Sequence, residues 1–65
     1  MSFFDPRYRV ERGIGGSWAY AGATPSLRTA KGMADWWANN PGCSGRVIDQ
    51  RTGRIVYIVP PGGGR

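Results

Sequence analysis

Alternation of apolar and polar residues predicts two β-strands in the first third of the chain. Tyr8 and Val10 alternate with charged neighbours, which is the two-residue period of a half-buried strand. Residues 17–21 resume this alternation, with two aromatic residues on one face and two alanines on the other. The glycine-rich stretch 13–16 separates the two segments, so we expect a β-hairpin.

A helix is predicted over residues 25–39. Thr24 is a favourable N-cap, and Pro25 suits the first helical position, where its missing N–H costs nothing. The sequence Asn-Asn-Pro-Gly at 39–42 ends the helix. At about 100° per residue, one helical face collects small alanines between two bulky residues, which lets the helix lie close to a sheet. The residues of this face are Leu27, Ala30, Ala34, Trp37 and Ala38.

The last third of the chain predicts a second hairpin. Residues 46–49 and 54–59 are strand-like, and the connecting stretch 50–53 ends in Gly53, which accepts a positive φ. The second arm is apolar on both faces, as in a central strand that is covered on both sides. We therefore expect the strand around Tyr57 to pair with the strand around Val10 in the middle of the sheet.

These elements predict an α+β fold in the order ββαββ, with one helix on one face of a four-stranded, mainly antiparallel sheet. We expect a single domain over residues 7–59, an N-terminal arm over 1–6 and a flexible Pro/Gly tail over 60–65. A domain of this size buries only about 60% of the surface of its unfolded chain, so a partner chain would help to stabilise it.

A single helix leaves the opposite face of the sheet open. That face would carry either Val56 and Ile58 or the alternating set Ile55, Tyr57 and Val59, and neither set should remain in water. The pattern therefore predicts a non-enzymatic interaction protein. Its expected partner is a second copy, in a homodimer formed through the uncovered face, or another protein.

The charge suggests an alternative function. Lys and Arg number nine against four Asp and Glu, giving a net charge of +5, although eleven glycines and a preference for Arg over Lys also fit a compositional bias. Basic and aromatic residues on one sheet face can neutralise and stack single-stranded nucleic acid. The candidate basic residues for such a surface are Arg7, Arg9, Arg46 and Arg54.

Trp36 is a further binding candidate, because it lies opposite the predicted core face of the helix, with Arg28 nearby. Exposed tryptophan is enriched at binding hot spots. The alternative is that Trp36 folds over the end of the helix or lies beneath the N-terminal arm.

Catalysis, metal binding and a cofactor are not expected. The chain has no histidine, the residue that most often serves in acid–base chemistry near neutral pH. The lone Cys43 is expected in a loop, without a base to activate it. No signal peptide and no apolar run of about 20 residues is apparent, so we expect a cytoplasmic protein with no membrane contact.

Overall fold

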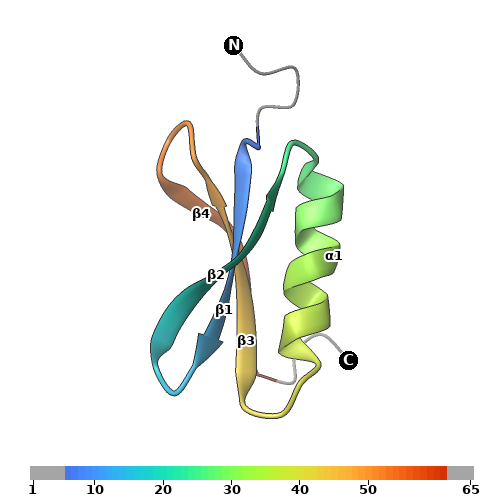
Figure 1. Ribbon diagram of the computed structural model, residues 1–65, viewed down its shortest axis with the longest axis vertical. Helices are drawn as coiled ribbons and strands as arrows, with labels where there is room; N and C mark the ends of the chain where they lie inside the picture. The colour runs from blue at the N-terminus through green and yellow to red at the C-terminus, as the bar shows by residue number, and fades with distance from the viewer. Residues whose placement is uncertain (1–5, 62–65) are drawn as a thin grey trace.

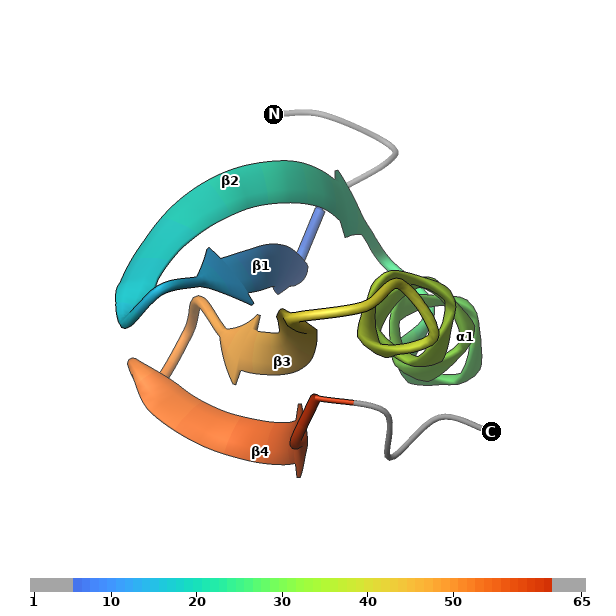
Figure 2. The ribbon, with the colours of Figure 1, turned by 90° about the horizontal axis from the view of Figure 1, so that it is seen from below.

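A computed structural model describes residues 6–61 of the chain and confirms the predicted ββαββ order (Figure 1). One helix packs on one side of a four-stranded sheet, and Figure 2 shows no other labelled element on the opposite side. No helix within residues 6–61 has the length and apolar character needed to cross a membrane. The elements are β1 (Tyr8–Ile14), β2 (Ser17–Thr24), α1 (Leu27–Ala38), β3 (Cys43–Asp49) and β4 (Arg54–Val59).

The strand order is β2-β1-β3-β4, and every neighbouring pair is antiparallel. The prediction that β1 and β4 form the central pair is therefore wrong, because β3 lies between them and β4 is an edge strand. The two sides of β4 are apolar for different reasons. Tyr57 and Val59 face the helix, whereas Ile58 lies on the uncovered side.

Both edge strands contain a β-bulge. The β1–β2 register shifts after Val10, which leaves Ala21 as an extra residue in β2. The β3–β4 register shifts between Val47 and Ile48, which makes Val56 the extra residue in β4. Bulges twist an edge strand and interrupt its regular hydrogen-bonding groups, which discourages pairing with another strand.

Glycines make both hairpin turns possible. Gly15 and Gly16 have φ values of 59° and 85°, and Gly53 has a φ of 75°, all in the region that favours glycine. The second hairpin begins from a longer strand than expected. Cys43 is the first residue of β3 and pairs with Ile14, so its predicted place in a loop is wrong.

The helix begins two residues later than predicted, at Leu27. Ser26 is the N-cap in place of Thr24, and its hydroxyl accepts a hydrogen bond from the Thr29 amide at 3.2 Å. Thr24 instead accepts a bond from the Ser26 amide at 3.3 Å, which places Pro25 in the turn before the helix. Thr24 and Ser26 are both residues that cap helices well, so composition alone did not separate them.

The core lies between the helix and the two central strands. Val10 and Val47 are fully buried against Ala30 and Ala34, and Leu27 and Trp37 pack partly buried around them. The helix approaches β3 so closely that a Cβ atom added at Gly45 would lie 2.8 Å from the Ala34 Cα. Small residues on both elements therefore set the distance between the helix and the sheet.

Tyr57 connects the edge strand β4 to the helix. Its hydroxyl donates a hydrogen bond to Asp35 Oδ1 at 2.6 Å, and the Lys31 ammonium lies 5.4 Å from the centre of its ring. The bond to the Asp35 carboxylate, followed by burial and the negative charge of Asp35, raises the pKa of Tyr57. This contact helps to direct Tyr57 toward the helix and away from the uncovered face.

Candidate docking surface

The side of the sheet opposite the helix is the candidate functional surface, and we call it the open face (Figure 2). Side chains alternate between the two sides of each strand, so the paired residues of neighbouring strands lie on the same side. The open face is formed by Arg9, Glu11, Gly13, Trp18, Tyr20, Ala23, Ser44, Arg46, Ile48, Ile55 and Ile58.

One row of side chains crosses the whole open face. Glu11 of β1 pairs with Tyr20 of β2 on one side and with Arg46 of β3 on the other. Arg46 in turn pairs with Ile58 of β4. The row therefore has an aromatic residue at one edge, an acid and a base in the middle, and an aliphatic residue at the other edge. We call it the central row.

Glu11 is the electrostatic centre of the open face. It is only 8% exposed, although no element covers this side within the described part of the chain. Its carboxylate accepts hydrogen bonds from Arg9 Nε at 2.9 Å and from Arg46 Nε at 2.7 Å. Charge-assisted bonds of this kind are stronger than neutral ones. The three side chains together carry a charge of +1, so Glu11 neutralises one of the two positive charges at the centre of the face.

Two aromatic rings shield the guanidinium groups. The Arg46 guanidinium carbon lies 4.0 Å from the centre of the Trp18 ring, and that of Arg9 lies 4.9 Å from the centre of the Tyr20 ring. Trp18 also covers Gly13, where an added Cβ would meet the indole at 3.0 Å. Both cation–π contacts engage arginine surfaces that a stacked base would otherwise use.

The β4 side of the open face is aliphatic. Ile58 is 57% exposed, and Ile55 and Val56 are also exposed. The sequence allows two alternating sets of β4 residues on this face, and the bulge at Val56 mixes them. Ile55 pairs with Ile48 and Ile58 pairs with Arg46, so both isoleucines lie on the open face while Tyr57 turns toward the helix.

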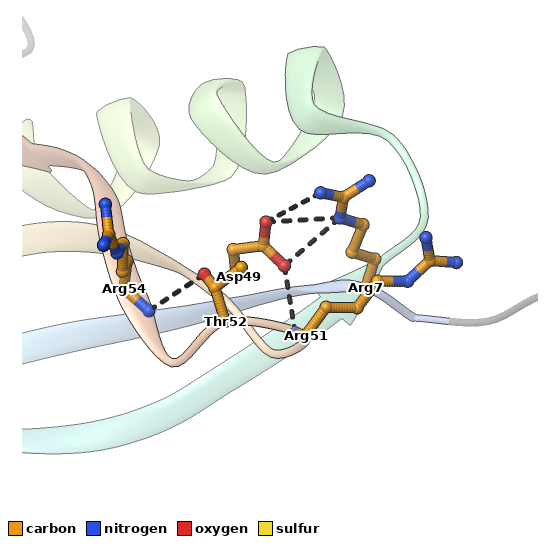
Figure 3. A network of polar contacts seen from close by, with 5 residues as sticks. All are labelled: Arg7, Asp49, Arg51, Thr52 and Arg54. Atoms are coloured by element: carbon orange, nitrogen blue, oxygen red, sulfur yellow. Dashed lines mark hydrogen bonds and ion pairs between the residues drawn. The ribbon is translucent and has the colours of Figure 1, made fainter.

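The candidate arginines fall into two separate groups. Arg9 and Arg46 lie on the open face, but Arg7 binds Asp49 at the β3–β4 hairpin, with Arg7 Nη2 at 2.9 Å from Asp49 Oδ2 (Figure 3). Arg54 lies beside this hairpin, and its backbone amide donates to Thr52 Oγ1 at 3.3 Å. A single patch of all four arginines is therefore not formed.

The pKa of Asp49 is lowered, chiefly by the hydrogen bond from Arg7. Burial opposes this change, whereas a bond from the Arg51 amide and the charges of Arg7 and Arg51 add to it. The carboxylate also accepts the Arg51 amide bond at 3.0 Å within the turn. These contacts give Asp49 a structural role at the hairpin.

Trp36 lies on the outer surface of the helix and is 61% exposed, and Arg28 is exposed on the same helix. The Trp36 and Trp37 rings are nearly perpendicular, with 4.9 Å between their centres. Gly32 has no atom within 4 Å of an added Cβ, so the surface one turn before Trp36 is unobstructed. A binding role for Trp36 or Arg28 remains a prediction.

Glu11 was not identified from the sequence as a site residue. The spacing of Arg9 and Glu11, two positions apart on one strand, is the signal that places them on the same face. The contact with Arg46 depends on the β1–β3 register, which the sequence does not specify. Within residues 6–61, no cluster of three potential metal-ligating side chains is formed. No protein-family model, curated protein or solved structure matches the chain.

Proposed function

We propose that the protein is a non-enzymatic interaction module that forms a homodimer through its open face. The observation that carries this proposal is the exposed aliphatic edge of Ile55 and Ile58 beside a group of charges that is already paired. Covering these isoleucines removes apolar surface from water, and the internal pairing of Glu11 lowers the charge that association must desolvate.

The edges of the sheet offer a less suitable route to association. β2 and β4 are the two edge strands, and each contains a bulge. Because bulges interrupt the regular row of backbone donors and acceptors, strand-to-strand pairing at these edges is disfavoured. Packing of one face on another uses side chains and does not need a regular edge.

The size of the face predicts a weak dimer. Strands about 4.8 Å apart and about seven residues long, at about 3.3 Å per residue, give the four-stranded sheet a footprint of roughly 450 Å². Two copies then bury roughly 900 Å² of flat sheet area, without the additional surface of the protruding side chains. This area is close to the lower limit of about 1,000 Å² for a specific interface. We expect a dissociation constant on the order of micromolar.

The test is a charge introduced at the aliphatic edge. Ile58→Glu places a carboxylate where the proposed interface is most apolar, and it should shift the chain toward the monomer mass in multi-angle light scattering at high micromolar concentration. The matched control is Ile14→Glu. Ile14 is similarly exposed, at 54%, but belongs by alternation to the other side of the sheet.

The expected result is a dimer for the unmodified chain and for Ile14→Glu, and a monomer for Ile58→Glu. Circular dichroism of each variant checks that the fold is retained. A chain that is monomeric at every concentration, or equal loss of the dimer in both variants, would contradict the proposed function.

Nucleic-acid binding is the second candidate, favoured by the net charge of +5 and by the contacts of Arg9 with Tyr20 and of Arg46 with Trp18. It ranks lower because Glu11 engages both arginines. Phosphate contacts predict an affinity that falls steeply with salt. Fluorescence anisotropy with single- and double-stranded probes tests this alternative, and absence of binding at low salt rejects it.

A further inference from the structure

We propose that the two copies pack face to face about a two-fold axis that runs parallel to the strands. This inference rests on the homodimer proposed above and specifies its geometry. In this arrangement the strand order of one copy is reversed over the other, so that β2 lies on the partner's β4 and β1 lies on the partner's β3.

The central row supplies the charge complementarity. Along it, the order of side chains is Tyr20, Glu11, Arg46 and Ile58. Reversal of this order sets the position of Glu11 opposite the partner's Arg46 and the position of Arg46 opposite the partner's Glu11, while each carboxylate stays bonded within its own chain. The two Glu11–Arg46 pairs then lie antiparallel, which is the attractive arrangement of two dipoles.

The apolar ends of the central row are also matched by this reversal. Tyr20 and Ile58 are each 57% exposed and occupy opposite edges of the sheet. A two-fold axis parallel to the strands places the Tyr20 ring on the partner's Ile58, and the symmetric contact forms at the other edge. Both exposed apolar ends are covered in a single docking event.

The next row follows the same rule. Arg9 pairs with Ala23 of β2 and with Ile48 of β3, and Ile48 pairs with Ile55 of β4. Reversal places the small Ala23 on the partner's Ile55, and the aliphatic stem of Arg9 against the partner's Ile48. The guanidinium of Arg9 remains bonded to Glu11 of its own chain, so it needs no new partner.

The other face-to-face arrangement has its two-fold axis across the strands. It keeps the strand order, so β1 lies on the partner's β1 and β3 lies on the partner's β3. When the central rows meet, Glu11 faces the partner's Glu11 and Arg46 faces the partner's Arg46. Like charges in direct opposition are destabilising, and each would lose its remaining contact with water. In this register the charge pattern favours the axis parallel to the strands.

Site-specific cross-linking distinguishes the two arrangements. We would prepare Tyr20→Cys and Ile58→Cys separately in a Cys43→Ser background, since Cys43 is the only cysteine. One variant carries an affinity tag so that mixed products differ in mass. A short bis-maleimide is added at high micromolar protein, to each variant alone and to an equal mixture.

The expected result is a mixed product of the tagged and untagged chains, with almost complete loss of product when either variant is alone. The reason is distance. Facing residues are separated only by the sheet-to-sheet spacing of about 10 Å. In the reversed order, the two Tyr20 positions are separated by this spacing and also by about three strand spacings, or about 14 Å, across the sheet. Ala23→Cys with Ile55→Cys provides a second pair, should a cysteine in the central row weaken the dimer.

Cross-linking of Tyr20→Cys with itself, or of Ile58→Cys with itself, would overturn the proposed axis while leaving the homodimer intact. A dimer mass in light scattering without any product from either mixed pair would also overturn it. Failure of the proposed function gives a different result, because the unmodified chain would then be monomeric before any cysteine is introduced.

Discussion

Two carboxylates organise the polar contacts of the sheet, one on each side of it. Glu11 lies at the centre of the open face, and it holds Arg9 and Arg46 in ion pairs that leave a charge of +1. Asp49 closes the β3–β4 hairpin through Arg7 and the amide of Arg51 (Figure 3). Partners of opposite charge reduce the cost of holding each of these buried carboxylates in its ionised form.

Asp49 predicts an acid-dependent loss of stability. Its pKa is lowered in the folded chain, so its contribution to the free energy of unfolding is fully present above the usual value of 3.8. As the pH falls below that value, the unfolded chain takes up the proton first, and stability declines until the lower folded pKa is passed. Urea unfolding between neutral pH and strong acid measures the decline.

The control for this prediction is Asp49→Asn, which removes the titrating group and keeps the shape of the side chain. Its free energy of unfolding should be lower than that of the unmodified chain at neutral pH, and the difference should shrink in acid. An equal pH dependence in both chains would show that other groups cause the decline.

At the scale of elements, small residues on the helix determine how it meets the sheet. Ala30, Ala34 and Ala38 are fully buried, and the backbone of Ala34 lies against Gly45 of β3. Gly32 lies on the same helix but has open space around an added Cβ. Two glycines in adjacent elements therefore predict opposite responses to the same substitution.

Gly32→Ala should raise the free energy of unfolding by about 1 kcal/mol, because alanine favours the helix and the added methyl group meets no other atom. Gly45→Ala should lower it by about 1–3 kcal/mol, because the methyl group collides with the backbone of Ala34. Thermal unfolding of both variants measures the difference, and stabilisation by Gly45→Ala would contradict the described packing.

The sequence predicted elements better than their arrangement. Local signals such as Gly53 in its turn and the alanine face of the helix are contained in short stretches, and both were correct. The central position assigned to β4 was wrong, because an apolar pattern on two faces does not state what covers each face. The bulge at Val56 changed which β4 residues reach the open face, and it depends on pairing with β3.

At the scale of the whole molecule, the central feature is a sheet with one covered face and one open face (Figures 1 and 2). The open face combines an aliphatic edge, an aromatic edge and a paired charge centre between them. Because these three zones follow one another across the strands, we propose that the face docks on a copy of itself in reversed order. Self-association would also add the buried apolar surface that a 65-residue chain has difficulty providing alone.

A dilution series followed by methyl resonances in solution NMR tests this account most directly, because it reports association and location together. The methyl signals of Ile48, Ile55 and Ile58 should shift with protein concentration across the micromolar range, while those of Ile14 stay constant. Signals that are independent of concentration, or shifts at Ile14 that match those at Ile58, would contradict docking through the open face.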